Sequence, residues 1–387
     1  MDFNSAKLFK FQATLSLYSF CITQLLIWRK RSLVLYPGGK FSYEEREIPT
    51  LQTERDVIIR VIATGLCGSD VHYWQHGGIG RYIVEKPIIL GHESSGIVVE
   101  SGPQSGLAVG DRVALEPGVA CNTCRPCRAG RYNLCHRMRF AATPPYDGTL
   151  ATYYRLPAEC CYKLPPHISL CNGALIEPLS VAVHSCRLAG DMQEKAVVVF
   201  GAGPVGLLCG GVARAFGAST VTVVDVVSSR LASALKYGAT HTHQSTGQSA
   251  QQNAEDILAT AGLDIGANVV LDATGAEPCL NAGIHALAPG GTFVQVGLGR
   301  PNPSIPVGQI CDKEIVFKGS FRYGPEDYQT AIGLASSRRI RLEGLVTHEF
   351  DFSEAREGFQ NAANRAGIKS IIYGPGVDRN MANEVIA

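Results

Sequence analysis

The sequence has almost no excess of charge of either sign, and it has no internal repeat and no low-complexity tract. Lys and Arg number 35 against 34 Asp and Glu, a formal balance of +1. A chain this close to neutral is expected to have no broad electropositive surface, so nucleic acid is excluded as a partner and a neutral small molecule is favoured as the ligand. The absence of repeats excludes a coiled coil or a repeat array.

A long, undiluted apolar run is also missing. The most apolar stretch, residues 11–28, contains several Gln, Ser and Thr residues, and no small-residue cleavage site follows it. We interpret residues 1–31 as an atypical N-terminal extension and leave them out of the fold, with a short membrane anchor or signal segment as the alternative. A membrane partner is therefore not expected, and the protein is predicted to be cytoplasmic.

The length and the hydrophobic pattern predict two domains of the α/β class. A chain of 387 residues is too long for one compact core. Short strands broken by turns run from Ser32 to about residue 165, which predicts a β-rich part. Residues 174–190 have helical spacing and are expected to link two lobes. Short apolar strands then alternate with helical or Gly-rich segments from Ala196 to Gly319, a pattern typical of βαβ units and a parallel sheet.

Cysteine is abundant, and its spacing indicates a metal site. Of 13 cysteines, four lie within fifteen residues, in the pattern C-x2-C-x2-C-x7-C. Two-residue spacings strain direct disulfides and suit chelation, and four thiolates match a closed, structural zinc site. Free or disulfide-linked cysteines are the alternative. Clustered thiols beside scattered ones favour a reducing compartment. The four residues are Cys121, Cys124, Cys127 and Cys135.

A dinucleotide site is predicted where the sequence GAGPVG follows the apolar strand 196–200 and begins a helix. Gly201 permits the tight turn, Gly203 lets the backbone approach a pyrophosphate, and Gly206 lets helix and strand pack closely. Pro204 and Val205 complete the motif at the start of the helix. A Gly-rich turn in a fold that binds no nucleotide is the alternative.

The residues after the second strand of this unit indicate which dinucleotide is bound. Asp225 lies nineteen residues after Gly206, at the end of the strand, where its carboxylate is placed to accept hydrogen bonds from the adenosine ribose. A carboxylate there repels a 2′-phosphate, which favours NAD over NADP. Arg230 instead favours NADP, because its guanidinium would suit a phosphate.

A second group of metal-binding residue types is dispersed along the chain. Cys67 lies in the segment CGSDVH, His92 and Glu93 are adjacent, and Glu177 precedes a proline. Each alone is compatible with an ordinary buried thiol or a helix-start pair. Together they form a mixed Cys, His and carboxylate set suited to a catalytic zinc that keeps one position open. Asp70 is expected to be a structural carboxylate rather than a ligand.

Several longer segments resemble the sorbitol and xylitol dehydrogenases of the zinc-containing medium-chain superfamily over about residues 33 to 375. The resemblance is carried by CGSDVHYW, GHESSG, the cysteine quartet, MRFAATPPYDGTL, ALIEPLSVAVH, GAGPVG and GSFRYG. It implies a Rossmann domain with a doubly wound parallel sheet, inserted in a GroES-like β-rich catalytic domain. The boundaries that it implies are 32–178 for the GroES-like domain, with the zinc loop 121–135, then 179–322 for the Rossmann domain and 323–387 for the return to the catalytic domain.

The same resemblance implies roles for individual residues. The catalytic zinc ligands would be Cys67, His92 and Glu93, with a catalytic Glu177 close by that holds a zinc-bound water or ligates the zinc directly at some stage. A glutamate at 177, where alcohol dehydrogenases of the superfamily have a cysteine, indicates polyols rather than ethanol-like alcohols. Tyr73, Arg322 and Tyr323 would line the polyol pocket, and Asp225 and Arg230 would meet the adenosine end of NAD. Val296, Gly297, Leu298, Ser320, Phe321 and Arg322 would flank the nicotinamide.

The sequence therefore predicts an NAD-dependent zinc polyol dehydrogenase that oxidises a secondary alcohol to a ketose. The favoured reaction is xylitol to D-xylulose, and the second candidate is sorbitol to fructose. Ser69 is assigned the first step of a proton relay and His72 a later one, although a plain surface histidine is the alternative at 72. Two rivals stay open: another zinc alcohol dehydrogenase acting on L-arabinitol or a secondary-metabolite alcohol, and a non-catalytic relative that binds NAD and zinc. A homo-oligomer, dimer or tetramer, is expected.

Overall fold

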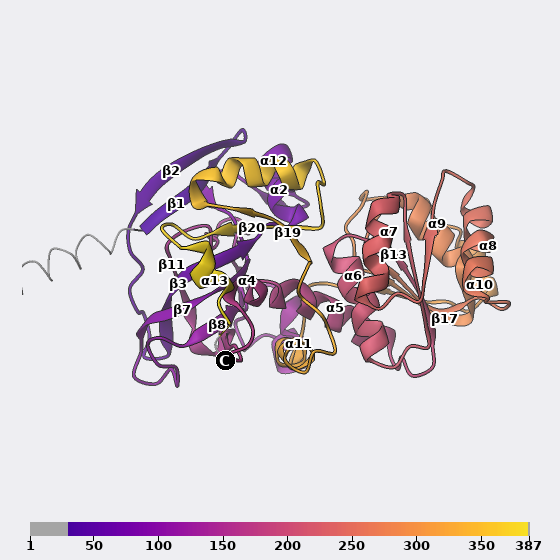
Figure 1. The fold of residues 1–387 in the computed structure, drawn as a ribbon, viewed down its shortest axis with the longest axis horizontal. Coiled ribbons are helices and arrows are strands. Elements are labelled where there is room, and N and C mark those ends of the chain that lie inside the picture. Colours follow the sequence, from indigo (N-terminus) through magenta and orange to yellow (C-terminus); the bar gives the residue numbers. More distant parts are fainter. Residues whose placement is uncertain (1–29, 386–387) are drawn as a thin grey trace, which may run out of the picture.

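A computed structural model describes residues 30–385 and shows two lobes. Figure 1 shows that the lobe on the left contains both the beginning and the end of the described chain, whereas the lobe on the right is built from its middle. One domain is therefore inserted in the other, as the sequence predicts. The apolar segment 11–28 lies outside the described residues.

The catalytic lobe is built on a mixed sheet whose central strand is almost completely buried. β3 (Asp56–Gly65) has the sequence DVIIRVIATG, and only Arg60 is not fully buried, so the strand is covered on both faces. The sheet order is β12-β8-β7-β3-β20-β19, with β11 also pairing with β3. The other strands of this sheet are β7 (Glu93–Ser101), β8 (Arg112–Leu115), β11 (Tyr153–Pro157), β12 (Cys161–Lys163), β19 (Val346–Phe350) and β20 (Lys369–Tyr373).

Shorter elements complete the catalytic lobe. A three-stranded sheet has the order β2-β1-β6, and two small two-stranded antiparallel sheets pair β4 with β5 and β9 with β10. The bounds of these strands are β1 (Lys30–Tyr36), β2 (Lys40–Arg46), β4 (Gly78–Ile79), β5 (Tyr82–Ile83), β6 (Ile88–Ile89), β9 (Gly118–Val119) and β10 (Arg139–Phe140). The helices are α2 (Gly68–His76), α3 (Arg125–Arg128), α4 (Leu170–Gly173), α12 (Ala355–Ala363) and α13 (Arg379–Asn383).

The inserted lobe has six parallel strands in the order β15-β14-β13-β16-β17-β18. Counted from its own first strand, this is the order 3-2-1-4-5-6 of a Rossmann domain, so the predicted doubly wound sheet is confirmed. Its strands are β13 (Ala196–Phe200), β14 (Thr220–Asp225), β15 (His241–Gln244), β16 (Ala267–Asp272), β17 (Leu287–Gln295) and β18 (Val316–Gly319). Its helices are α6 (Pro204–Ala215), α7 (Ser228–Ala234), α8 (Ala250–Ala261), α9 (Glu277–Ala286) and α10 (Val307–Asp312).

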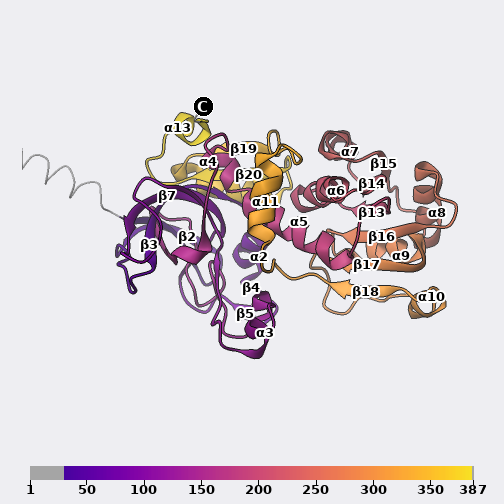
Figure 2. The ribbon, with the colours of Figure 1, turned by 90° about the horizontal axis from the view of Figure 1, so that it is seen from below.

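Two helices connect the lobes. α5 (Ile176–Ala189) runs from the catalytic lobe into the Rossmann lobe, and α11 (Asp327–Ser336) packs beside it (Figures 1 and 2). The boundary that we placed between 178 and 179 thus falls in the first turn of α5, and the boundary at 322 falls between β18 and α11. The boundary after residue 31 falls inside β1, where Lys30 pairs with Arg46 and the backbone N–H of Arg31 donates to Thr152 Oγ1 at 2.9 Å.

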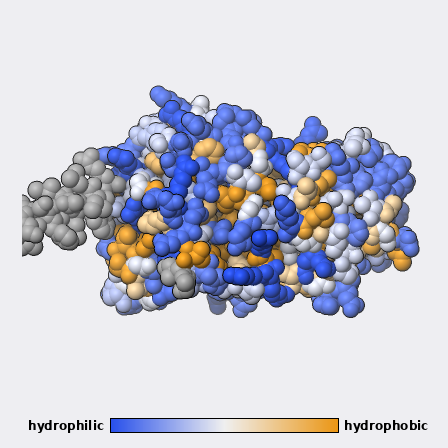
Figure 3. Space-filling model, in the orientation of Figure 1, coloured by the Kyte–Doolittle hydropathy of each residue, from blue (hydrophilic) through white to orange (hydrophobic). Residues whose placement is uncertain are grey.

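One face of the molecule is mostly polar. On the face drawn in Figure 3, hydrophilic residues predominate and hydrophobic residues form separate patches. Among residues 30–385, no helix has both the length and the apolar character that crossing a membrane requires.

Candidate active site and cofactor site

Strand register brings the three predicted ligands of the dispersed site together. β3 and β7 are antiparallel, and Gly65 at the end of β3 pairs with Glu93 at the start of β7. Cys67, two residues after β3, therefore lies beside His92 and Glu93. One ligand atom from each of the three lies within 4.8 Å of the others. A thiol, an imidazole and a carboxylate at these separations suit a zinc ion with an open position.

Asp70 ties together the two segments that supply the ligands. Its buried carboxylate accepts a hydrogen bond from the backbone N–H of Cys67 at 3.1 Å and another from the backbone N–H of Gly91 at 3.0 Å. One carboxylate oxygen also lies 3.6 Å from His92 Nδ1. A carboxylate on one imidazole nitrogen orients the ring and leaves the other nitrogen for a metal. This is the structural role that we expected for Asp70.

Lys369 is part of this site, although our sequence analysis did not single it out. It begins β20, and Ile371 of that strand pairs with Gly65 of β3. Its buried ammonium forms an ion pair with Glu93 Oε2 and donates to the carbonyl of Leu66 at 3.0 Å. Burial lowers the pKa of Lys369, but the charge and hydrogen bond of Glu93, together with Cys67 and Glu177, raise it overall, so the amine stays charged. A lone lysine at a strand start had given no reason to suspect this role.

The residues predicted for the polyol pocket surround the same cluster. Glu177 lies in the first turn of α5, and burial raises its pKa to about 7. The Arg322 guanidinium lies over the ring of Phe140, 3.6 Å from its centre, and that ring is 5.8 Å from the ring of His92. Burial lowers the pKa of Arg322, against the opposing effect of Glu177. The pocket thus combines a carboxyl group with a guanidinium held on an aromatic ring.

Tyrosine hydroxyls complete the pocket. Tyr73 of α2 is buried and close enough to His92 and Arg322 for both to lower its pKa, although burial raises it overall. Tyr323 is also buried, and within residues 30–385 its hydroxyl makes no hydrogen bond of ordinary geometry, although it lies close enough to the Glu177 carboxyl to lower the pKa of that group. Because buried hydroxyls nearly always have a full hydrogen bond, this hydroxyl can still accept a polar ligand as its partner.

The two relay residues lie on one side of α2, one turn apart. Ser69 is partly buried in the first turn, and His72 is exposed. Burial, together with the charges of His76 and Arg365, lowers the pKa of His72. The structure therefore places Ser69 beside the predicted ligand Cys67 and His72 further out towards solvent.

The four clustered cysteines converge as a separate group. Their sulfur atoms all lie within 4.8 Å of one another, and Cys124 Sγ is 3.4 Å from Cys127 Sγ. The backbone N–H of Cys121 points at Cys135 Sγ over 3.4 Å, as is usual around metal-bound thiolates. A hydrogen bond from the backbone of Thr123 is the main cause that lowers the pKa of Cys121 to about 5. A group of four sulfurs, with no fifth donor among residues 30–385, fits a structural zinc site.

The glycine motif has the geometry of a pyrophosphate cradle. Gly201 has φ +96°, which an L side chain rarely adopts, and a Cβ at Gly206 would overlap the Gly201 carbonyl oxygen. A Cβ at Gly203, the N-cap of α6, would meet only open space. No side chain caps this helix, so the N–H groups of its first turn are free for an anion. The motif residues that follow, Pro204 and Val205, form the start of α6.

Asp225 and Arg230 take different positions around this cradle. The Asp225 carboxylate, at the end of β14, accepts hydrogen bonds from the backbone N–H groups of Ala202 at 2.7 Å and Val227 at 2.8 Å, so it borders the glycine turn directly. Arg230 of α7 donates instead to the carbonyl oxygen of Arg365 in the catalytic lobe, at 2.6 Å. Contact of Arg230 with the adenosine end of a cofactor stays a prediction.

The loops predicted to flank the nicotinamide follow β17 and β18, at the same edge of the sheet as the glycine motif. The backbone N–H groups of Val296 and Gly297 both donate to the carbonyl of Asp272, and the N–H of Ser320 donates to the carbonyl of Gln295. The loops are therefore joined to each other through the sheet. Leu298 is 74% exposed and Phe321 42% exposed, so both side chains are open to a ligand.

Comparisons with known proteins give the same two-part division. Residues 53–166 match the family model described as alcohol dehydrogenase GroES-like domain, and residues 204–337 match zinc-binding dehydrogenase. A protein of Aspergillus clavatus named "Probable D-xylulose reductase A" is 52% identical over 344 residues, which cover 89% of this chain and 96% of that protein. The D-xylulose reductase A of Aspergillus niger is 50% identical, with the same coverage. Among solved structures, this chain is similar to a crystal structure from Escherichia coli, described as an oxidoreductase/dehydrogenase of unknown specificity involved in membrane biogenesis. The two superimpose with a TM-score of 0.83 at 32% identity, and the match covers 89% of this chain and 99% of that one.

Proposed function

Because the chain belongs to the polyol dehydrogenases of the zinc-containing medium-chain superfamily, we propose that it oxidises xylitol to D-xylulose with NAD and catalyses the reverse reduction. The observation that carries this proposal is the cluster of Cys67, His92 and Glu93 with Glu177 beside it, in a chain whose Rossmann lobe has a pyrophosphate cradle. The names of the Aspergillus relatives favour xylitol within the polyol class.

The donor sets fit two zinc ions and one NAD. Cys67, His92 and Glu93 would hold the catalytic zinc, the four clustered cysteines the structural one, and the turn 201–206 with Asp225 the cofactor. When bound, the catalytic zinc supplies a Lewis acid that lowers the pKa of a substrate hydroxyl, and NAD supplies the hydride acceptor.

Glu177 provides a group that can exchange a proton near neutral pH. Burial holds its pKa at about 7, so at neutral pH both its protonated and its ionised forms are populated. The protonated form can donate a hydrogen bond to a polyol oxygen, and the ionised form can accept one from a polyol hydroxyl. An ordinary carboxyl with a pKa near 4 would offer only the second.

We assign removal of the hydroxyl proton to Ser69 and then His72. Ser69 lies two residues after the predicted ligand Cys67 and is partly buried, so its hydroxyl can accept the proton close to the metal site while it passes its own proton on towards His72. His72 is one turn further along α2 and exposed, and its lowered pKa favours the neutral imidazole that can accept a proton and release it to solvent.

The pocket favours a substrate with several hydroxyl groups. Arg322 brings a partly buried guanidinium, and Tyr323 brings a buried hydroxyl beside Glu177 that makes no hydrogen bond of ordinary geometry within the described chain. A polyol can pair with both, whereas ethanol would leave them unpaired, and sites built around substrate hydroxyls discriminate strongly against analogues that lack them.

A substrate panel tests this proposal. We expect kcat/KM for NADH formation to be highest with xylitol, lower with sorbitol and L-arabinitol, and lower by at least about 100-fold with ethanol, because ethanol leaves polar groups unpaired. With xylitol as substrate, kcat/KM should be higher with NAD than with NADP, because the Asp225 carboxylate repels a 2′-phosphate. Preference for L-arabinitol or an aromatic alcohol would support the other alcohol dehydrogenases, and no turnover in a protein that binds zinc and NADH would indicate a non-catalytic relative.

We propose further that the enzyme is a cytoplasmic homo-oligomer, a dimer or a tetramer. A site made of four thiolates is consistent with a reducing compartment. β18 is an edge strand of the Rossmann sheet, and it exposes Val316 and Phe317 at 45% and 41% (Figure 2). Such an edge is suited to pairing with a second copy. Light scattering should give a mass at least twice the 41.4 kDa of one chain, and a monomer would contradict this proposal.

A further inference from the structure

The connection between β18 and α11 carries the two predicted polyol contacts, Arg322 and Tyr323, in a strained backbone. Arg322 has φ +59°, in the left-handed region that non-glycine residues rarely occupy. A residue in this conformation is unfavourable by itself, so it persists only where neighbouring groups hold the backbone on both sides. The groups that hold this connection are therefore candidates for a role in substrate recognition.

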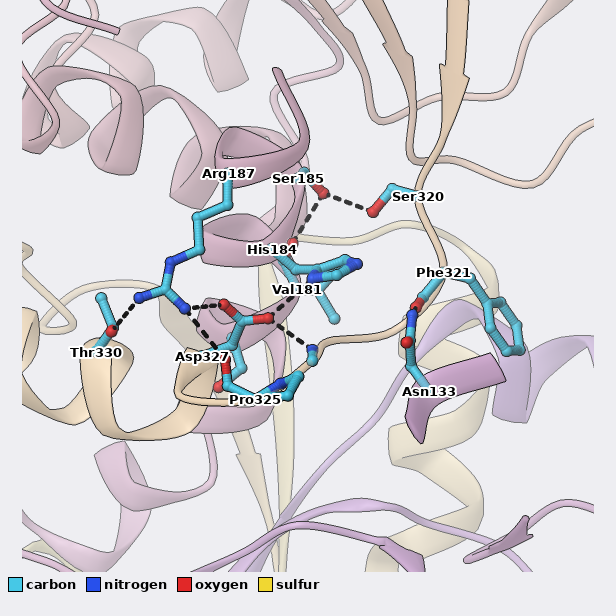
Figure 4. A network of polar contacts seen from close by, with 12 residues as sticks. Asn133, Val181, His184, Ser185, Arg187, Ser320, Phe321, Pro325, Asp327 and Thr330 are labelled. Carbon is cyan, nitrogen blue, oxygen red and sulfur yellow. Dashed lines mark hydrogen bonds and ion pairs between the residues drawn. The ribbon is translucent and has the colours of Figure 1, made fainter. Parts of the chain in front are cut away.

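On one side, the connection is held by the loop that contains the four cysteines. Asn133 is buried two residues before Cys135, and its Nδ2 donates to the carbonyl oxygen of Phe321 at 2.9 Å (Figure 4). The hydroxyl of the neighbouring Tyr132 lies 2.6 Å from Glu116 Oε1 and 3.1 Å from the carbonyl oxygen of Gly324, so its single proton is shared between these two acceptors. The cysteine-rich loop thus contacts the backbone immediately before Arg322 and two residues after it.

On the other side, Asp327 holds the connection against α5. Its buried carboxylate accepts hydrogen bonds from the backbone N–H of Gly324 at 2.6 Å and from His184 Nδ1 at 2.8 Å. Its other oxygen accepts one from Arg187 at 2.6 Å. Figure 4 shows His184 and Arg187 reaching Asp327 from the same helix. That helix also carries Glu177, so the substrate turn is fixed relative to the carboxyl group beside the metal ligands.

These contacts fix where the Arg322 side chain lies. The backbone is held at Phe321 and Gly324, and the guanidinium rests over Phe140, whose ring is next to His92. If the backbone carbonyl of Phe321 were no longer held, Arg322 could relax towards an ordinary backbone conformation. Its guanidinium would then move away from the ring of Phe140.

We propose that Asn133 is a positioning residue for polyol recognition, acting through the carbonyl of Phe321 to hold Arg322 over Phe140, with Asp327 as the opposing support. The four-cysteine loop thereby supports the substrate pocket as well as the fold of its own lobe. This inference rests on the proposed function, because it takes Arg322 as a contact of the polyol.

A double-mutant cycle tests the inference. Asn133→Ala should raise KM for xylitol about tenfold through the loss of one hydrogen bond. KM for NAD should rise by less, because Arg322 contacts the polyol directly, whereas Phe321 and Arg322 only flank the nicotinamide. Arg322→Ala should raise KM for xylitol at least as much. In the Arg322→Ala background, adding Asn133→Ala should change KM for xylitol less than about twofold, because both substitutions remove the same contact.

The outcomes separate the two proposals. If Arg322→Ala leaves KM for xylitol unchanged, the pocket of the proposed function is wrong and this inference falls with it. If Arg322→Ala raises KM for xylitol and Asn133→Ala raises it further by its full single-mutant factor, the assignment of Arg322 to the polyol pocket is supported but the positioning role of Asn133 is wrong. An equal rise of KM for NAD in Asn133→Ala would also overturn the positioning role, since it would indicate general loosening of the lobes.

Two further variants separate the hydrogen bond from damage to the loop. Asn133→Asp keeps the size of the side chain but replaces the donating NH2 with an oxygen, so it should raise KM for xylitol as Asn133→Ala does. Arg128 is exposed in α3 of the same loop, and Arg128→Ala should leave KM for xylitol unchanged. Zinc content should stay equal in all three. An Asn133→Asp variant with unchanged KM, or an Arg128→Ala variant that matches Asn133→Ala, would contradict the proposal.

Discussion

Cys67→Ser is expected to lower kcat/KM for xylitol by at least about 10³-fold while leaving NADH affinity nearly unchanged. A serine hydroxyl is a much poorer zinc ligand than a thiolate, and the Lewis acid contributes several kcal/mol to the transition state, where each 1.36 kcal/mol is tenfold in rate. The glycine turn at 201–206 belongs to the other lobe and does not depend on Cys67. Steady-state kinetics and titration of NADH fluorescence would measure the two effects.

A second thiol gives the matched control for this prediction. Cys311→Ser changes an exposed thiol of α10 in the Rossmann lobe and should leave kcat/KM unchanged. Zinc content should fall by one ion per chain in Cys67→Ser and stay constant in the control. Full zinc content with full turnover in Cys67→Ser would show that the catalytic site has been misplaced, and so would loss of NADH binding alone.

Lys369→Met is expected to destabilise the protein by about 3–5 kcal/mol, the usual cost of removing one partner from a buried ion pair. The Glu93 carboxylate would remain buried without its countercharge, and the carbonyl of Leu66 would lose its donor. Denaturant unfolding of the metal-free protein, monitored with a spectroscopic signal from the catalytic lobe, would measure this loss in the free energy of unfolding. Affinity for the catalytic zinc should also change, because Lys369 holds the Glu93 side chain in place.

Lys313→Met is the control for Lys369. Lys313 in the Rossmann lobe donates to the carbonyls of His285 and Leu287 and has no carboxylate partner in the described chain, so its replacement should have a smaller effect on stability. Lys369→Arg keeps a cation and should recover part of the loss. A Lys369→Met protein as stable as the parent would mean that the pair with Glu93 does not matter for the fold.

Much of the fold could be predicted from local patterns. The apolar strand before GAGPVG and the glycine-rich turn after it predict a parallel sheet and a helix start, and the structure has both. Similarly, the spacing of the cysteine quartet brings its four sulfurs together within one short loop. In both cases the residues that must meet are near neighbours in the chain, so short-range geometry is sufficient.

Other features could not be predicted because they depend on pairing between distant segments. Lys369 meets Glu93 only because β20 and β7 both pair with β3, and Asn133 meets Phe321 only because the cysteine-rich loop packs on the connection before α11. Lys30 and Arg31, which we had assigned to the N-terminal extension, are held in β1 by pairing with β2 and by Thr152, which is remote in the sequence.

The amino-acid sequence by itself thus determined the chemistry of this protein: which groups can bind metal, which turn can receive a pyrophosphate, and the family to which both belong. Only the tertiary structure decided which residues support them, such as Asp70, Lys369, Asn133 and Asp327. The physical reason is that ligand type and turn geometry are properties of short segments. The partner of a buried charge or carbonyl, in contrast, is set by strand register and packing across hundreds of residues.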